Sequence, residues 1–265
     1  MKETCRRLQL WLLACLAVAL WSPAASAEDV ELTRVFARHH ARGTFVLSSL
    51  DGRTTFIHDD ARARRRLTPA STFKIANSLI ALEEGVIDEK RVMKWDGSEQ
   101  PLPEWNRDHT LESAFRVSCV WCYQRLARRI GAGKYRDYLS RFKYGNGSVG
   151  VEVAQFWLDG SLRISALEQV AFLRAVVARK LPLKPSTYET LARIMVLARG
   201  PTYVLRGKTG TSMETKPALG WLVGEVATGA EHWLFAMNLD LGAQADRAHR
   251  LALAREALRA KHILP

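Results

Sequence analysis

Apolar, strand-like runs occupy both ends of the chain, and helical patterns fill the middle. Residues 43–50 and 53–58 flank Asp51-Gly52, a dipeptide that favours a tight turn, so they predict a β-hairpin. Near the C-terminus, residues 203–211, 218–228 and 232–241 are strand-like and are separated by small turns. We therefore expect the two ends of the chain to complete one antiparallel sheet.

Apolar residues with helical spacing follow the hairpin. Residues 67–70 can start a helix, and the apolar pattern that follows ends near Gly85. Residues 166–180 and 243–260 predict two amphipathic helices. We expect a mixed α/β fold with a helical insertion in the sheet. The expected boundaries are 28–65 and 200–265 for the part with the sheet and 66–199 for the mainly helical part.

Residues 1–27 have the anatomy of a secretory signal peptide. Basic residues near the start precede an apolar run at residues 8–20, and residues 25–27 offer small side chains for cleavage. The apolar run is short for a membrane span. We therefore expect export to the periplasm, cleavage near Ala27 and no membrane span afterwards. Lipidation of Cys15 is an alternative that the sequence leaves open.

The composition is that of an ordinary globular protein, with 48% hydrophobic and 25% charged residues among 265. The formal net charge is +12, and loss of residues 1–27, with three basic residues and one acidic residue, would leave +10. A basic protein can bind nucleic acid, but a short arginine run is more typical of a solvated surface. That run contains Arg62, Arg64, Arg65 and Arg66. For an exported protein we expect no nucleic-acid partner.

Two cysteines, Cys119 and Cys122, remain after signal cleavage. Small apolar side chains packed near a helix start are the favoured interpretation, and a short disulfide or a redox or metal motif are the alternatives. A second cysteine pair for a four-thiolate zinc site is missing from this segment. The seven histidines form neither an H-x-H nor an H-E-x-x-H pattern, and His39-His40 would point to opposite faces of a strand. We therefore expect no metal site.

Ser71 and Lys74 form a candidate pair of nucleophile and base. On a helix, residues three apart share a face, so the serine hydroxyl and the lysine amine can lie at hydrogen-bond distance. Serine is a weak nucleophile unless a neighbouring base takes its proton. Because Pro69-Ala70 precedes the serine, we expect its backbone N–H at a helix N-terminus, where it can stabilise an oxyanion. The spacing alone also arises by chance, so the pair needs supporting motifs.

Lys208-Thr209-Gly210 and Ser118 are such motifs. The lysine and threonine offer a positive charge and a hydroxyl for an anionic substrate group, and Gly210 permits close approach of a ligand to the strand. Taken alone, this tripeptide would favour an ordinary strand with an exposed lysine. Ser118 lies 47 residues after Ser71 and 90 residues before Lys208. In these three motifs and their order, the chain resembles the penicillin-recognising serine enzymes.

Several further segments match one family. They are residues 69–75, Ser118-x-Val120, residues 144–146, 156–158 and 162–165, Lys208-Thr209-Gly210, residues 95–97 and Gly220-Trp221. The match as a whole runs from about Gly43 to Arg250, which is nearly the whole of the segment after residue 27. In these segments the chain resembles the class D, oxacillinase-type serine β-lactamases. The resemblance implies the fold shared by serine β-lactamases and penicillin-binding transpeptidases.

Val120 separates this family from its relatives, most of which carry Ser-x-Asn at the second motif. An apolar neighbour disfavours the charged form of Lys74 and can lower the pKa of its amine by several units. A neutral amine can add CO2. The resemblance implies that Lys74 becomes N6-carboxylysine, a general base for both halves of the reaction. The indole N–H of Trp157 would hold this carbamate, although core packing is the usual role of a tryptophan.

The resemblance also implies a mechanism, in which Ser71 opens the β-lactam ring and forms an acyl-enzyme. The backbone N–H groups of Ser71 and Thr211 would form the oxyanion hole, and Ser118, helped by Lys208, would relay a proton to the lactam nitrogen. Ser118, Lys208, Thr209, Gly210, Thr211 and Arg250 would bind the substrate. Arg250 suits the substrate carboxylate because arginine can grip it with two hydrogen bonds, and Arg247 is the alternative.

Three other functions compete with hydrolysis. A penicillin-binding transpeptidase or carboxypeptidase would share the motifs, but Val120 and Trp157 argue against it. A β-lactam sensor would stay acylated, and sensors usually hang from membrane spans. A binding protein without catalysis would not need this combination of motifs. We expect hydrolysis of penicillin-type antibiotics and resistance to them, no cofactor beyond CO2 or bicarbonate, and a monomer or homodimer. The residues around Trp105, Met213 and Leu158 should set substrate preference.

Overall fold

The computed structural model describes residues 28–229, 231–242 and 247–265. The predicted signal peptide (residues 1–27) and the start of the predicted last helix (residues 243–246) lie outside these ranges. Among the helices in the described ranges, none is long and apolar enough to cross a membrane.

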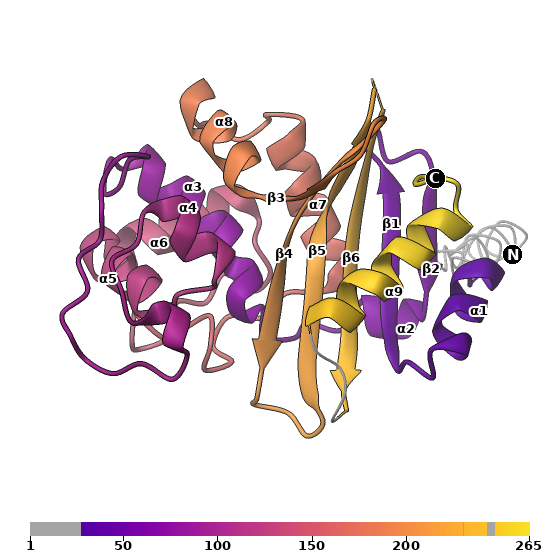
Figure 1. Ribbon diagram of the computed structural model, residues 1–265, viewed down its shortest axis with the longest axis horizontal. Coiled ribbons are helices and arrows are strands. Elements are labelled where there is room, and N and C mark those ends of the chain that lie inside the picture. The colour runs from indigo at the N-terminus through magenta and orange to yellow at the C-terminus, as the bar shows by residue number, and fades with distance from the viewer. Residues whose placement is uncertain (1–27, 230, 243–246) are drawn as a thin grey trace, which may run out of the picture.

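One antiparallel sheet forms the centre of the described structure (Figure 1). Its strand order is β2-β1-β6-β5-β4-β3, so the first two strands pair with strands from the end of the chain. The strands are β1 (Gly43–Ser49), β2 (Thr55–His58), β3 (Val196–Arg199), β4 (Val204–Ser212), β5 (Ala218–Thr228) and β6 (Glu231–Leu241). The predicted mixed α/β fold, with a sheet built from both chain ends and a helical insertion, is confirmed. The short edge strand β3 was not predicted.

Helices surround the sheet on both faces. They are α1 (Val30–Arg38), α2 (Asp60–Ala63), η1 (Ala70–Phe73), α3 (Lys74–Glu83), η2 (Pro103–Trp105), α4 (Leu111–Arg116), α5 (Val120–Ile130), α6 (Ala132–Phe142), α7 (Ala166–Val177), α8 (Pro185–Ile194) and α9 (Arg247–Ala260). The predicted helix at 166–180 ends three residues early, and Ser165 and Glu168 cap its start reciprocally. Helix α1 was not predicted; Asp29 caps it by accepting from the backbone of Leu32.

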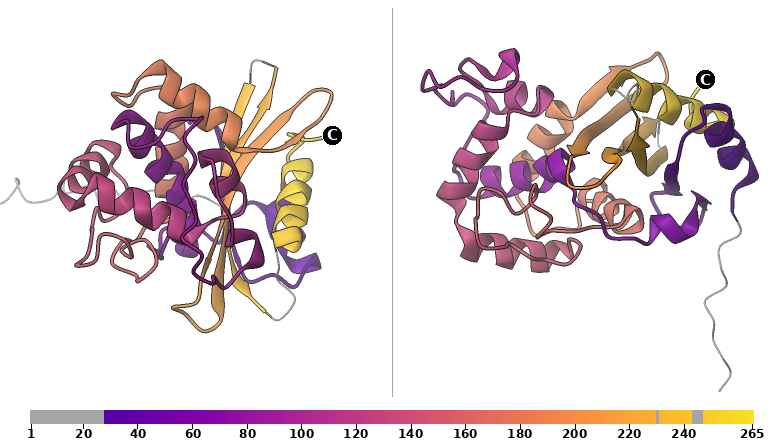
Figure 2. Two further views of the ribbon diagram at one scale, coloured as in Figure 1. Left: turned by 60° about the vertical axis from the view of Figure 1, so that its left-hand side comes forward. Right: turned by 90° about the horizontal axis from the view of Figure 1, so that it is seen from below.

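Two hydrophobic cores lie on opposite faces of the sheet. α1 and α9 lie side by side and cover one face, whereas the helical insertion covers the other (Figures 1 and 2). Within β1, Phe45 and Leu47 belong to the first core and Val46 to the second. Because both faces are covered, successive residues of this strand are buried, rather than every second one. β4 belongs to the same sheet, so one of its faces also points toward the helical insertion. The candidate motifs lie at this face.

The arginine run at residues 62–66 is only partly a solvated surface. Arg64, Arg65 and Arg66 are exposed, as expected. Arg62 is an exception, because its guanidinium donates to Asn238 Oδ1 (2.6 Å) and Asp240 Oδ1 (2.7 Å) and its side chain is 14% exposed. A partly buried arginine that is paired in this way holds α2 against β6.

Candidate active site

Ser71 lies on the tight turn η1, directly before α3. The predicted helix therefore begins with a 3-10 turn, and Lys74 opens its α-helical part. The Nζ atom of Lys74 lies 3.0 Å from the Oγ atom of Ser71. Ser71 is half-buried, whereas Lys74 has no exposed surface. The structure thus places a partly accessible nucleophile in front of a fully buried base.

The nucleophile turn is held from several directions. The hydroxyl of Thr72 donates to the carbonyl oxygen of Pro69 (2.7 Å), and the side-chain amide of Gln169 donates to that hydroxyl oxygen (2.9 Å). The indole N–H of Trp221 donates to the carbonyl oxygen of Thr68 (2.9 Å). Since these donors come from α7 and β5, the turn is fixed by tertiary contacts as well as by its own sequence.

Burial changes the chemistry of Lys74. Removal from water lowers the pKa of its amine from 10.5 to about 7. The ring centre of Tyr123, on α5, lies 5.0 Å from the amine. Val120, the predicted apolar neighbour, opens α5, which packs against α3. Near neutral pH a large share of the Lys74 amine is therefore unprotonated and can accept a proton.

A second serine–lysine pair joins the helical insertion to the sheet. The amine of Lys208 lies 2.5 Å from Ser118 Oγ and 3.1 Å from the carbonyl oxygen of Thr209. Lys208 is almost fully buried on β4, and its amine lies 5.5 Å from the ring centre of Phe115. Ser118 has a φ of +58°, a left-handed conformation that is uncommon for serine. Residues in such conformations cluster at functional sites, which supports a functional role for this pair.

The strand with the K-T-G motif runs against the nucleophile turn. A Cβ atom on Gly210 would lie 2.8 Å from the Pro69 carbonyl oxygen and 3.1 Å from the backbone nitrogen of Thr72. A side chain at this position would push the strand and the turn apart. Because of this contact, Thr211, the predicted second oxyanion donor, lies one residue beyond the point where β4 meets the turn.

Arg250 reaches the same end of β4 from helix α9. Its Nη1 atom donates to the carbonyl oxygen of Gly210 (2.6 Å) and to the hydroxyl of Thr211 (3.2 Å). Gly220 on β5 leaves room for this approach, because a Cβ atom there would lie 3.1 Å from Arg250 Cδ. The structure therefore places this guanidinium beside the K-T-G motif. The side chain of Arg247, the alternative, lies outside the described part of the structure.

Trp157 is buried beside the nucleophile segment. Its ring stacks on Phe73, with 5.7 Å between the ring centres. Its Nε1 atom is buried, and no hydrogen-bond partner for it exists among the described residues. Buried indole N–H groups are normally satisfied, so core packing explains the ring but not its donor. The donor is available to an acceptor that enters the site.

Solved structures with this fold include class D β-lactamases. The class D β-lactamase YbXI from Nostoc matches with a TM-score of 0.86 and 37% sequence identity, covering 89% of this chain and 100% of that chain. The class D β-lactamase FUS-1 (OXA-85) from Fusobacterium nucleatum matches with a TM-score of 0.86 and 34% identity, covering 90% of this chain and 100% of that chain.

Sequence relatives lead to the same family. A model of the penicillin binding protein transpeptidase domain matches residues 50–259. Beta-lactamase OXA-48 from Klebsiella pneumoniae is 40% identical over 231 residues, which cover 87% of each chain. The chain belongs to the class D β-lactamases. It is therefore a serine β-lactamase, and the resemblance inferred from its sequence is confirmed.

In this class D enzyme, residues 144–146 fix the segment that follows Trp157. Gly145 has a φ of +55°, and a Cβ atom there would lie 2.0 Å from the carbonyl oxygen of Arg163. Asn146 donates to the Ser161 carbonyl oxygen and accepts from the backbone of Arg163, each at 2.9 Å. Residues 144–146 therefore form a sharp turn, and its contacts clamp residues 161–163.

Replacing Gly145 by alanine should destabilise the β-lactamase by roughly 2–4 kcal/mol, because the new methyl group collides with backbone and the positive φ adds strain. Gly147→Ala is a matched control: its φ is +65°, but no atom lies within 4 Å of the added Cβ. It should cost about 1 kcal/mol. Urea unfolding of both variants measures the difference; equal losses would contradict the clamp.

Cys119 and Cys122 form a disulfide across the first turn of α5. Both are fully buried, so the favoured packing interpretation describes their environment but missed the bond between them. Cys119 lies between Ser118 and Val120 of the second motif. The disulfide therefore links this family motif to the helix that follows it.

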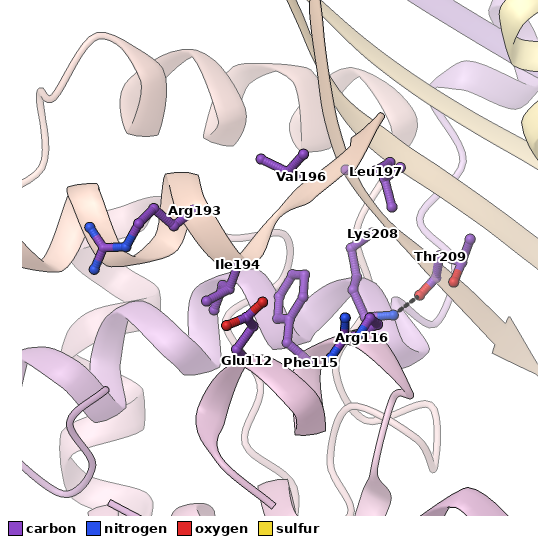
Figure 3. Close-up of a pocket in the computed structure, with 10 residues that line it drawn as sticks. Glu112, Phe115, Arg116, Arg193, Ile194, Val196, Leu197, Lys208 and Thr209 are labelled. Atoms are coloured by element: carbon purple, nitrogen blue, oxygen red, sulfur yellow. Dashed lines mark hydrogen bonds between the residues drawn. The ribbon is translucent and has the colours of Figure 1, made fainter. Parts of the chain in front are cut away.

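A pocket of about 300 Å³ lies beside Lys208 (Figure 3). It lies between α4, α8, β3 and β4 of the β-lactamase. Phe115, Ile194 and Leu197 form part of its apolar wall, and Lys208 and Thr209 border it. The sequence does not reveal this pocket, because its residues come from four separate elements and form no local motif.

Residues expected to shape substrate preference differ in exposure. Met213 is 79% exposed, whereas Trp105 and Leu158 are half-buried. The indole N–H of Trp105 donates to the carbonyl oxygen of Val117 (2.9 Å), next to Ser118. Trp105 is therefore a fixed neighbour of the second motif in this class D enzyme, and Met213 is a freely accessible side chain.

Proposed function

We propose that this class D enzyme hydrolyses the β-lactam ring of penicillin-type antibiotics through an acyl-enzyme on Ser71, and so confers resistance to them. The contact of 3.0 Å between Ser71 Oγ and the fully buried amine of Lys74 carries this proposal. A base with a pKa of about 7 is matched to proton abstraction at neutral pH. We further propose that residues 1–27 are a signal peptide and that residues 28–265 act as one domain in the periplasm.

In acylation, Ser71 attacks the lactam carbonyl carbon as its proton passes to Lys74. The backbone N–H groups of Ser71 and Thr211 stabilise the negative charge that develops on the carbonyl oxygen. Ser118, whose hydroxyl lies 2.5 Å from the amine of Lys208, then delivers a proton to the lactam nitrogen as the C–N bond breaks. Lys208, Thr209 and Arg250 surround the end of β4 with the charge and hydroxyl groups that a substrate carboxylate needs.

Lys74 meets the requirements for carbamylation. CO2 reacts with a neutral amine, and burial of Lys74 favours that form. The unpartnered Nε1–H of Trp157 supplies a buried donor for an anion. When formed, the carbamate would supply a general base for acylation and for hydrolysis of the acyl-enzyme. No cofactor other than CO2 or bicarbonate is then required.

Hydrolysis of a chromogenic cephalosporin, with and without bicarbonate, tests the proposal. Turnover should fall when CO2 is stripped and return when bicarbonate is added. Stoichiometric acylation of Ser71 without turnover would instead identify a sensor or a transpeptidase. Turnover indifferent to bicarbonate would leave the hydrolase but remove the modified lysine.

Recovery with bicarbonate should depend on pH through the amine of Lys74. With a pKa of about 7, the neutral fraction falls roughly tenfold for each pH unit below that value. CO2-stripped enzyme should therefore reactivate about ten times faster at pH 8 than at pH 6 at equal dissolved CO2. Stopped-flow assays of regained turnover measure the rate. Equal rates at the two pH values would contradict a buried amine that titrates near neutrality.

Arg250→Ala should raise KM for a penicillin about 10- to 100-fold and change kcat less, because the carboxylate of the bound substrate loses a cationic partner. Arg259→Ala is the matched control, since Arg259 is exposed near the other end of α9. Steady-state kinetics separate the two constants. An unchanged KM in the Arg250 variant would exclude this arginine from substrate binding.

A further inference from the structure

Three side chains that can bind a soft metal ion cluster at the second motif. His109 offers a ring nitrogen and Cys119 and Cys122 offer their sulfurs, and these three atoms lie within 4.8 Å of one another. The cysteines have no exposed surface, and His109 is 1% exposed. Backbone hydrogen bonds between His109 and Met93 (2.7 and 3.0 Å) hold the histidine in place. The cluster is therefore built into the fold between the start of α4 and the start of α5.

The hydrogen bonds of His109 leave one nitrogen for a ligand. Its Nδ1 lies 3.0 Å from the hydroxyl oxygen of Ser113, which itself donates to the carbonyl oxygen of Thr110 (3.3 Å). The serine hydrogen is thus directed to the carbonyl, and we assign the imidazole proton to Nδ1. Nε2 then carries a lone pair. It is buried and has no hydrogen bond of good geometry within the described structure. Burial lowers the pKa of the imidazole, and a hydrogen bond to the backbone of Glu104 opposes this by favouring the protonated ring, so zinc must replace that contact.

We propose that reduction of the disulfide turns this cluster into a zinc site with two thiolates and one imidazole. A dithiol reductant supplies two electrons and two protons and becomes a cyclic disulfide, leaving two free thiols. Zn2+ then displaces both thiol protons as it binds Cys119 Sγ, Cys122 Sγ and His109 Nε2. The reaction balances without any other reactant.

Charge and geometry both suit this ion. Zn2+ with two thiolates and one neutral imidazole has no net charge, which reduces the cost of a fully buried site. Bond lengths of about 2.3 Å to sulfur and 2.0 Å to nitrogen require ligand atoms roughly 3.5–3.8 Å apart. The sulfurs must separate after reduction, and a ring nitrogen of His109 is already within 4.8 Å of them. The contact from Ser113 to Nδ1 orients the ring, as outer-sphere partners of zinc-bound histidines do.

The test uses the folded enzyme before and after reduction. We choose a phosphine reductant because, unlike a dithiol, it does not bind zinc through thiolates. It reduces the disulfide to two thiols and becomes a phosphine oxide, whose oxygen comes from water. After its removal without air, Co2+ is titrated as an optical probe and bound Zn2+ is counted by elemental analysis. Reduced enzyme should bind one metal ion per chain with a strong thiolate-to-cobalt absorption band. Oxidised enzyme should bind none at this site.

Two variants and a control sharpen the result. His109→Asn should weaken zinc binding at least ~100-fold, and Ser113→Ala about 10-fold, because they remove a ligand and its orienting partner. His40→Asn removes an exposed histidine and should change nothing. Equal affinity in wild type and His109→Asn, or no uptake by reduced enzyme, would overturn the proposal. Loss of the far-ultraviolet circular dichroism signal on reduction would also overturn it, because the site depends on the fold. None of these readouts depends on β-lactam turnover.

Discussion

Ser71→Ala should lower β-lactam turnover by at least ~10⁴-fold, because the proposed acyl-enzyme forms on the Ser71 hydroxyl. The loss should appear in kcat, whereas substrate binding through Lys208 and Thr209 should persist. Ser186→Ala is a suitable control, since Ser186 is exposed in the first turn of α8. Steady-state kinetics on both variants measure the difference.

Mass spectrometry gives an independent test of the same residue. Wild-type enzyme mixed with a slowly hydrolysed β-lactam should gain the mass of one inhibitor molecule, and peptide mapping should place it on Ser71. Ser71→Ala should gain none. A covalent adduct on the alanine variant would show that another nucleophile reacts, and the proposed mechanism would then be wrong.

Lys74→Met should also lower turnover, by about 10³- to 10⁴-fold, since both acylation and hydrolysis lose their general base. Methionine has a similar length and suits a fully buried position. Bicarbonate should restore none of the activity. Trp157→Phe is the informative partner, because it keeps the amine and removes the unpartnered N–H donor. Its turnover should rise with bicarbonate concentration, whereas Lys74→Met should not respond.

The same Lys74 substitution should stabilise the fold. The folded-state pKa of about 7 lies below the ordinary 10.5, so between these pH values the unfolded chain binds more protons at this residue. Unfolding free energy therefore rises with pH across that window, and the cost of burying Lys74 is largest below pH 7. Lys74→Met removes this cost and should add roughly 2–4 kcal/mol near pH 7. Urea unfolding at pH 7 and pH 10 should show the gain shrinking with pH; a destabilised variant would contradict the buried, unfavourable amine.

Local patterns in the sequence were sufficient for the parts of the fold that depend on neighbouring residues. Asp51-Gly52 predicted the first hairpin, and the strand-like runs predicted β4, β5 and β6 to within one or two residues. The short strand β3 was missed because its four residues carry too little periodic signal. Helix α1 was missed as well, although Asp29 is a favourable N-cap.

By itself, the sequence determined the pair of Ser71 and Lys74, because a spacing of three residues on a helix fixes which side chains meet. The motifs along the chain also determined the family. Tertiary structure alone decided the contacts between distant segments: Ser118 with Lys208, Arg250 with Gly210, and Cys119 and Cys122 with His109. It also decided that Lys74 is buried and that Trp157 has an unpartnered donor. These properties depend on how whole elements pack and exclude water, and no local spacing in the chain encodes that packing.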